Sequence, residues 1–274
     1  MRIEDVDRPR VVGGATDSIL HALDDFGLHW DGAVVFQSAR IERYRDELAH
    51  LQEKGLVYDC VCSRRELANV TRRGITGELF YPGTCRDKGW KLALPVAQRV
   101  RVPSTAVAFH DLVQGPREQN LAEQSGDFVL LRADGIFSYH LAVVVDDAEQ
   151  GITEIVRGSD LLDSTPRHLF LQKVLDVSSP TYFHIPVVVE ASGEKLSKQT
   201  RARPLEKKHA SELLYAALAF LGQNPSLELQ TAHPQEILKW ALQNWYLAAI
   251  PRVLSLPLPD SEILFAGNNG VSET

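Results

Sequence analysis

The sequence contains no apolar run long enough to span a bilayer, and its opening residues, Met1 to Asp5, carry charges where a secretory signal has an apolar stretch. Cysteine is also scarce, with three residues in 274, which excludes a disulfide-rich secreted scaffold. We therefore expect a cytoplasmic protein that does not engage a membrane.

Positive charge is not in excess. The formal net charge is −7 at pH 7, whereas proteins that coat nucleic acid generally rely on clustered Lys and Arg. A local basic surface is still compatible with this balance. One candidate contains Arg201, Arg203, Lys207 and Lys208, although such clusters are more often ordinary solvated surface.

The composition is that of a globular protein, with 44% apolar and 24% charged residues. At 274 residues the chain can form one large domain or several smaller ones. Strand patterns alternate with helix patterns, which predicts an α/β fold. We expect strands over residues 2–7, 100–102, 128–131, 139–145, 151–156 and 185–189, and helices over 17–27, 38–54, 165–175, 209–221 and 234–248.

Two of these segments need a comment. The run 139–145 is the densest β-branched stretch of the chain, and we expect it to form a strand that is buried on both faces. The segment beyond Leu254 is rich in Pro, Gly and Asn, and we expect it to be loose.

A lysine-containing loop, Gly193 to Gln199, follows the strand predicted over 185–189. Its Lys195 and Lys198 are spaced so that both ammonium groups can contact the same polyanion. Phosphoryl and adenylyl transfer need positive charge where the leaving pyrophosphate develops its own charge. Taken alone, a Lys-x-Ser-Lys segment is more often a solvated loop.

The three cysteines are confined to one segment, as a Cys-x-Cys pair (Cys60, Cys62) followed by Cys85. Cysteines separated by one residue are poorly placed to form a disulfide with each other, and the cytoplasm keeps thiols reduced. The spacing is compatible either with thiolates that converge on zinc or with three structural thiols. A tetrahedral zinc needs a fourth ligand, for which His110, a carboxylate and Tyr81 are the candidates.

Several polar residues follow predicted strands. Ligands of open α/β sheets bind beyond the carboxyl ends of the strands, and Glu4, Arg157 and the two lysines occupy such positions. The guanidinium of Arg157 is suited to a carboxylate, with an internal ion pair to Glu154, Asp160 or Glu4 as the alternative. Tyr139 is either a ligand contact or a core aromatic residue whose hydroxyl bonds to the backbone.

Six motifs occur in an order that resembles a known family. They are Arg2-Ile3-Glu4-Asp5-Val6-Asp7, Gly27-Leu28-His29-Trp30-Asp31-Gly32, Gln37-Ser38, Tyr139-His140-Leu141-Ala142-Val143-Val144-Val145-Asp146-Asp147, Ile155-Val156-Arg157-Gly158-Ser159-Asp160-Leu161-Leu162 and Lys195-Leu196-Ser197-Lys198-Gln199. Together they resemble the catalytic core of class I glutamyl-tRNA synthetases. Within that group the chain is most similar to the glutamyl-Q-tRNA(Asp) synthetases. The Cys-x-Cys and Tyr-x-x-x-Cys patterns are similar to their zinc site, and few residues follow Gln199 for an anticodon-reading region.

The resemblance implies a Rossmann-like class I aminoacyl-tRNA synthetase catalytic fold with an inserted zinc-containing subdomain and a short helical C-terminal part. The catalytic core would comprise residues 1–57 and 126–200, the insert 58–125, and the helical part with its loose tail 201–274. The implied reaction is ATP-dependent activation of glutamate to glutamyl-adenylate, followed by transfer of glutamate to the queuosine base of tRNA(Asp). Mg²⁺ would accompany ATP, and we expect a monomer.

The resemblance also implies roles for individual residues. Glu4 would hold the ammonium group of glutamate, while Tyr139 and Arg157 would bind glutamate, Arg157 through a carboxylate. Lys198 would bind ATP and stabilise the triphosphate as it is attacked, with Lys195 in support. Catalysis of this kind depends on positioning and electrostatics and needs no side-chain nucleophile.

The same resemblance bears on the cysteine segment. It makes Tyr81 the expected fourth ligand, beside Cys60, Cys62 and Cys85, of one zinc ion per chain. The zinc would be structural and would orient the insert that meets the tRNA.

The beginning of the chain departs from the family pattern. The family has a further strand, an Arg-containing substrate loop, a His-x-Gly-type ATP signature and a helix ahead of Arg-Ile-Glu-Asp, whereas here Met1 directly precedes Arg2. We expect the reading frame to continue upstream, because the family often has Val before this motif and a GTG codon can be taken for a start. The 274-residue chain is then expected to be poorly active or inactive. Two alternatives are a truncated, catalytically impaired synthetase-like RNA-binding module and a fragment of a glutamyl-tRNA synthetase.

Overall fold

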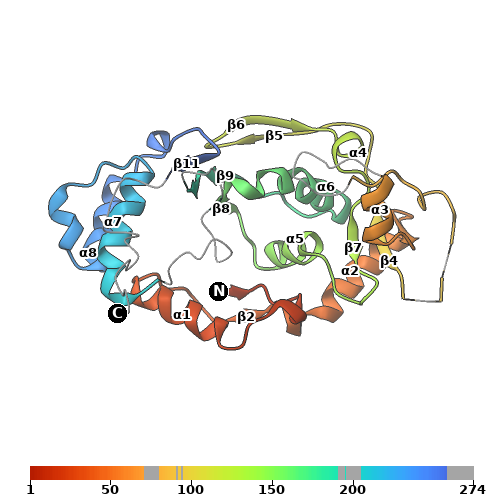
Figure 1. Cartoon of the computed structure of the whole chain (residues 1–274), viewed down its shortest axis with the longest axis horizontal. Helices are drawn as coiled ribbons and strands as arrows, with labels where there is room; N and C mark the ends of the chain where they lie inside the picture. Colours follow the sequence, from red (N-terminus) through yellow and green to blue (C-terminus); the bar gives the residue numbers. More distant parts are fainter. Residues whose placement is uncertain (71–79, 91, 94, 191–194, 196–204, 258–274) are drawn as a thin grey trace, which may run out of the picture. The chain divides into compact units, whose positions relative to one another are not determined.

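The computed structural model describes residues 1–70, 80–90, 92–93, 95–190, 195 and 205–257 (Figure 1). The chain divides into two compact units. Unit 1 contains residues 1–12, 32–156 and 161–183, and unit 2 contains 13–31, 157–160 and the chain from 184 onward. Lys198, most of the lysine-containing loop, Arg201 and Arg203 lie outside the described residues.

Unit 1 mixes helices with short strands. Its helices are α2 (Ile41–Glu53), α3 (Arg64–Val70), α4 (Leu121–Gln124), α5 (Tyr139–Glu149) and α6 (Thr165–Leu175). Its strands are β1 (Arg2–Ile3), β2 (Val35–Phe36), β3 (Val57–Cys60), β4 (Ala97–Val100), β5 (Val107–Asp111), β6 (Gly115–Gln119) and β7 (Val129–Leu131). Two more strands, β8 (Glu154–Gly158) and β9 (Thr181–Ile185), pair with each other and include residues of both units.

Unit 2 is mainly helical in its described part. Its elements are α1 (Ala15–Asp25), α7 (Ala210–Phe220), α8 (Pro234–Asn244), β10 (Val187–Val189) and β11 (Ser255–Pro257). β10 and β11 pair in parallel, with Val187 opposite Ser255. The expectation of a loose segment beyond Leu254 is therefore wrong for residues 255–257, because pairing with β10 orders their backbone. Residues 258–274 lie outside the described part.

All five predicted helices are confirmed, with ends shifted by a few residues. The predictions over 17–27, 38–54, 165–175, 209–221 and 234–248 correspond to α1, α2, α6, α7 and α8. In α2 the buried residues are Tyr44, Leu48 and Leu51, which recur every three or four positions and so form a stripe along one face. This periodicity is the reason that the sequence alone identifies the helix.

The strands of the described residues form five small sheets instead of one continuous sheet. β3, β4 and β7 make an antiparallel sheet of three strands, and the other sheets are pairs. β1 pairs with β2 in parallel, as β10 does with β11, and parallel neighbours require crossover connections. The register of β3 and β4 places Tyr58 opposite Arg99 and Cys60 opposite Ala97.

The run 139–145 is helical, so the prediction of a strand there is wrong. It opens α5, whose N-cap residue Ser138 accepts a hydrogen bond through Oγ from the backbone N–H of Leu141 (3.4 Å). Residues 141–147 are all buried, so α5 buries side chains on every side. A helix that is buried all round has no helical period in its sequence, and its valines then imitate a buried strand. Consequently Tyr139 lies at the N-terminus of a helix.

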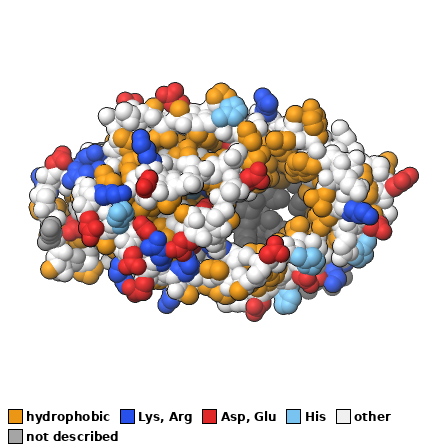
Figure 2. All heavy atoms as spheres, turned by 180° about the vertical axis from the view of Figure 1, so that it is seen from behind, with side chains coloured by type: hydrophobic (Ala, Val, Ile, Leu, Met, Phe, Trp, Pro, Cys, Tyr) orange, Lys and Arg blue, Asp and Glu red, His pale blue; other side chains and the backbone are white. Residues whose placement is uncertain are grey.

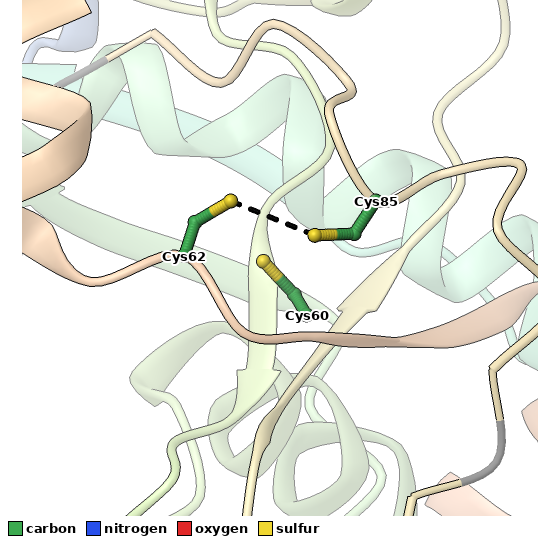
Figure 3. A group of neighbouring side chains, drawn as sticks. All are labelled: Cys60, Cys62 and Cys85. Atoms are coloured by element: carbon green, nitrogen blue, oxygen red, sulfur yellow. Dashed lines mark hydrogen bonds between the residues drawn. The ribbon is translucent and has the colours of Figure 1, made fainter.

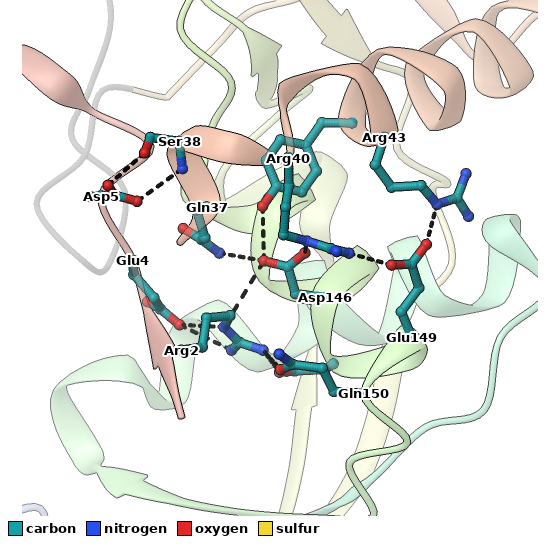
Figure 4. A network of polar contacts seen from close by, with 12 residues as sticks. Arg2, Glu4, Asp5, Gln37, Ser38, Arg40, Arg43, Asp146, Glu149 and Gln150 are labelled. Carbon is teal, nitrogen blue, oxygen red and sulfur yellow. Dashed lines mark hydrogen bonds and ion pairs between the residues drawn. The ribbon is translucent and has the colours of Figure 1, made fainter. Parts of the chain in front are cut away.

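A buried carboxylate joins α2 to α5 (Figure 4). Asp146 is fully buried and accepts hydrogen bonds from Arg40 Nε (2.7 Å), Gln37 Nε2 (2.8 Å) and Tyr44 Oη (2.8 Å). Burial, followed by the bond to Asp146, raises the pKa of the Tyr44 hydroxyl. Because a buried charge is stable only when it is paired and hydrogen-bonded, Asp146 serves the core of unit 1.

No helix in the described part of the chain is both long and apolar enough to cross a membrane. On the face drawn in Figure 2, Lys and Arg side chains are interspersed with Asp and Glu side chains. This mixture differs from the continuous basic stripe that is typical of proteins that coat nucleic acid.

Candidate functional site

Cys60, Cys62 and Cys85 converge within unit 1 (Figure 3). Their sulfur atoms all lie within 4.8 Å of one another, and the Sγ atoms of Cys62 and Cys85 are 3.5 Å apart. All three are free thiols; Cys60 and Cys85 are buried, and Cys62 is half-buried. Three thiols this close together, without a disulfide, could hold a metal ion.

Tyr81 joins this cluster. Its side chain is buried, and its Oη lies 3.4 Å from Cys60 Sγ and accepts a hydrogen bond from the backbone N–H of Cys85 at 2.8 Å. His110, another candidate from the sequence, lies on β5 and is not part of the metal-ligating group that the described residues form. Tyr81 therefore lies beside the three cysteines, and its role as a fourth ligand stays a prediction.

Two of the distances between these atoms fit a tetrahedral zinc ion. With Zn–S bonds of about 2.3 Å and Zn–O bonds of about 2.0 Å, tetrahedral ligands place two sulfurs about 3.8 Å apart and a sulfur and an oxygen about 3.5 Å apart. The observed separations of 3.5 Å between the Cys62 and Cys85 sulfurs and 3.4 Å between Cys60 Sγ and Tyr81 Oη are close to these values. Thiolate ligands are soft, which favours zinc over Mg²⁺ or Ca²⁺.

The surroundings shift the pKa values of Cys62 and Cys85 in opposite directions. Burial, followed by the neighbouring Cys85 and Cys60, raises the pKa of Cys62 to about 12. Burial opposes ionisation of Cys85 too, but hydrogen bonds from Tyr81 and from the backbone of Val61 outweigh it and lower the pKa of Cys85. A metal binds thiolates, so binding at this cluster releases protons.

Gly126 packs closely against the backbone of Tyr81, next to the cysteine cluster. It follows α4 with φ of +70°, and a Cβ atom at this position would lie 2.1 Å from the carbonyl oxygen of Tyr81. The backbone N–H of Tyr81 donates to the carbonyl oxygen of Ser125 (3.1 Å), which keeps the two segments in contact. Only glycine combines the left-handed backbone with this close approach.

Gly126→Ala is expected to displace Tyr81 and to lower the free energy of unfolding by more than the about 1–3 kcal/mol that left-handed backbone alone costs a non-glycine residue. Gly135→Ala is the matched control, because Gly135 has φ of +82° and nothing lies within 4 Å of its added Cβ. Urea denaturation of both variants measures the difference. Equal losses in the two variants would contradict the close contact as the cause.

Arg157 lies on β8, and a histidine orients its guanidinium. Nε of Arg157 donates to Nε2 of His184 on β9 at 3.0 Å, and His184 is fully buried. Because Nε2 accepts this bond, the imidazole proton is on Nδ1. The planar guanidinium then has a set direction, and a bidentate contact with a carboxylate would use Nη1 and Nη2. His184 was not identified from the sequence, since a lone histidine in an apolar strand carries no local signal.

Lys195 is tied to the segment that follows Arg157. Its Nζ lies 2.5 Å from Oδ2 of Asp160, and its backbone forms an isolated bridge with Val189. Gly158 makes room for this arrangement, because a Cβ atom there would lie 2.4 Å from Oδ1 of Asp160.

Glu4 and Tyr139, both expected to contact glutamate, belong to unit 1. Oε1 of Glu4 accepts from Nη2 of Arg2 at 3.0 Å, and 40% of the Glu4 side chain is exposed (Figure 4). Arg2 also pairs with Asp147, at 2.7 Å between Nη1 and Oδ1. The ring of Tyr139 packs against that of His168, with 5.5 Å between the centroids. Glu4 is thus oriented by Arg2 and partly exposed.

The fold is shared with solved synthetases. A glutamate-tRNA synthetase from Elizabethkingia anophelis superposes with a TM-score of 0.74 at 21% identity, covering 94% of this chain and 61% of that one. A glutamate tRNA ligase from Elizabethkingia meningosepticum, solved in complex with its amino acid, gives a TM-score of 0.71 at 21% identity, covering 94% and 59%. The chain thus spans about three fifths of these longer proteins. The similarity shows an α/β class I synthetase catalytic fold.

Sequence comparison gives the family. The family model described as tRNA synthetases class I (E and Q), catalytic domain, matches residues 1–239. A curated relative from Aromatoleum aromaticum, named glutamyl-Q tRNA(Asp) synthetase, is 49% identical over 94% of this chain and 82% of its own length. One of the same name from Dechloromonas aromatica is 48% identical over 94% of this chain and 86% of its own length. The chain therefore belongs to the class I tRNA synthetase (E and Q) catalytic-domain family, in its glutamyl-Q tRNA(Asp) synthetase branch.

Proposed function

We propose that the chain activates glutamate with ATP to glutamyl-adenylate and then transfers glutamate to the queuosine base of tRNA(Asp). The observation that carries this proposal is an identity of 46–49%, over 94% of the chain, to relatives named glutamyl-Q tRNA(Asp) synthetase. The same relatives disfavour a glutamyl-tRNA synthetase fragment. They also disfavour a synthetase-like module that only binds RNA, since each of them is named as a synthetase.

In the proposed glutamate site each residue acts through charge and direction. Glu4, held by Arg2 and partly exposed, would accept hydrogen bonds from the substrate ammonium. Arg157, oriented by His184, would bind a glutamate carboxylate, and the phenol of Tyr139 would complete the contacts. Such positioning lowers the barrier because the reacting groups are already placed when ATP is attacked.

In the proposed ATP site two lysines would act on the triphosphate. Lys198 would meet the triphosphate, where its ammonium offsets the charge that develops on pyrophosphate. Lys195, whose Nζ contacts Asp160, would support Lys198 in this role. Mg²⁺ would accompany ATP as part of the substrate, as is general for nucleotide phosphates.

We further propose that Cys60, Cys62, Tyr81 and Cys85 hold one zinc ion per chain. All four positions would be protein ligands, which is the closed coordination of a structural zinc. The ion would join the end of β3 to the segment around Cys85 and so shape the insert, residues 58–125, for contact with tRNA. Residues 1–57 and 126–200 would then form the catalytic core and 201–274 the helical part of a monomeric cytoplasmic enzyme.

ATP–pyrophosphate exchange tests the first step. Exchange is expected to depend on glutamate and to proceed without tRNA. The assay should be run on the 274-residue chain. Absence of exchange would favour the RNA-binding module.

Labelled glutamate tests the acceptor. Label is expected on tRNA(Asp) from cells that make queuosine and not on tRNA(Asp) from cells that lack it, with the same enzyme preparation. Purified tRNA(Glu) is the second control, and label on it instead would point to a glutamyl-tRNA synthetase.

A further inference from the structure

Arg99 lies against the cysteine cluster, although no motif in the sequence marks it. The residue is 8% exposed, and its Nε lies 3.2 Å from Sγ of Cys60. Its guanidinium carbon also lies 3.8 Å from the centroid of the Tyr81 ring. One buried cation therefore contacts two of the four proposed zinc ligands.

The sheet delivers Arg99 to this position. In the antiparallel pair β3–β4, Tyr58 is opposite Arg99 and Cys60 is opposite Ala97, so Arg99 and Cys60 are diagonal neighbours. A long side chain can span that diagonal. The register of β4 against β7 also shifts between Gln98 and Arg99, and such irregularities redirect side chains.

The buried guanidinium of Arg99 needs an anion. Its Nη1 donates to the carbonyl oxygen of Asp127 at 2.8 Å, whereas the carboxylate of Asp127 accepts from Tyr58 Oη (2.6 Å) and from the backbone N–H of Val102 (2.8 Å). Among the residues that the structure describes, Arg99 forms no ion pair with Asp or Glu. Since an unpaired buried charge is costly, the groups that can supply the anion are the sulfur of Cys60 and the phenolic oxygen of Tyr81.

We propose that Arg99 is the counter-cation of the zinc centre. Three thiolates and a phenolate bring four negative charges to an ion that carries two positive ones, which leaves a buried excess of negative charge. Arg99 offsets this excess by donating a hydrogen bond to the Cys60 thiolate and by stacking on the Tyr81 ring. The inference rests on the zinc site put forward above and adds a residue that positions and stabilises the ligands without binding the metal.

Zinc affinity, measured by competition with a colorimetric chelator, tests the proposal. Arg99→Gln is expected to weaken zinc binding about 10- to 100-fold, the range for partners of metal ligands. Arg99→Lys keeps the charge but not the planar fork, so it should recover part of the affinity. Arg101→Gln is the matched control. Arg101 is also next to β4 and stacks on an aromatic ring, that of Tyr58 at 4.8 Å, and it pairs with Asp87.

Comparing the loss of stability in the zinc-free and the zinc-loaded protein distinguishes a counter-cation role of Arg99 from simple packing. If Arg99 only packs, Arg99→Gln destabilises the zinc-free and the zinc-loaded protein equally in urea denaturation. If it is the counter-cation, the zinc-loaded protein loses much more. The thiolate-to-metal charge-transfer band of the Co²⁺-substituted protein should also shift in Arg99→Gln and not in Arg101→Gln.

Each outcome decides one question. A wild-type chain that holds no zinc would overturn the zinc site and, with it, the role of Arg99. If the wild-type chain holds zinc and the Arg99→Gln variant holds it equally tightly, only the role of Arg99 is overturned. Neither result bears on glutamate activation, which the exchange assay measures separately.

Discussion

Cys85→Ser is expected to leave the chain without tightly bound zinc. Cys85 is buried, and its Sγ lies 3.5 Å from that of Cys62, so the substitution removes one of the three clustered sulfur atoms. Removal of a direct ligand should cost more than the about 10- to 100-fold in affinity that loss of a ligand's partner costs. The wild-type chain should hold one zinc ion per chain after gel filtration, and the variant none, as measured by elemental analysis.

The same substitution should remove the stabilisation that zinc provides. When free zinc is at about 1,000 times the dissociation constant, binding to the folded chain adds about 4 kcal/mol to the free energy of unfolding. Added zinc should therefore raise the urea midpoint of the wild-type chain and not that of Cys85→Ser. Thr84→Ala, at an exposed neighbouring position, should behave as wild type. A zinc-dependent midpoint in Cys85→Ser would show that the metal lies elsewhere.

Arg157→Met is expected to abolish most glutamate activation. Truncating one partner of a hydrogen-bonded charge pair costs about 2–5 kcal/mol, which corresponds to a loss of roughly 30-fold to several thousand-fold in kcat/KM for glutamate. Arg157→Lys should recover little, because an ammonium cannot form the two parallel bonds of a guanidinium and cannot donate to His184 in the same geometry. The measurement is glutamate-dependent ATP–pyrophosphate exchange.

Two comparisons make this result specific to Arg157. Arg252→Met removes the same charge from an exposed position of unit 2 and should leave exchange unchanged. The KM for ATP should also change far less than the KM for glutamate, since Arg157 is assigned to the amino acid. An equal rise in both constants in Arg157→Met would contradict a direct contact with glutamate and would indicate a disturbed fold.

Local sequence patterns were sufficient to predict a periodic helix, the choices open to the cysteines and the family. The stripe in α2 identified that helix because Tyr44, Leu48 and Leu51 keep a helical period. The spacing of Cys60, Cys62 and Cys85 limited the choices to a metal cluster or structural thiols, and the structure brings the three sulfurs together. The ordered motifs were specific enough to indicate the family, which the comparisons then confirmed.

Local sequence patterns do not predict which elements are buried on all sides or which distant residues come into contact. The strand predicted over 139–145 failed because α5 is enclosed on all sides, so its sequence has no period that could separate a helix from a strand. Arg99, Gly126 and His184 escaped notice for a related reason. The contact that singles out each of them is with a residue far away in the chain: Cys60, Tyr81 and Arg157 respectively.

The residues of the chain thus specified its family, its periodic helices and the chemical types of its candidate ligands, since composition, period and spacing are properties of the chain itself. The three-dimensional arrangement assigned the partners: a guanidinium beside the Cys60 sulfur, an imidazole behind Arg157 and a glycine under Tyr81. Those assignments depend on strand register and close packing, which bring distant segments within hydrogen-bonding distance and arise only once the chain has folded.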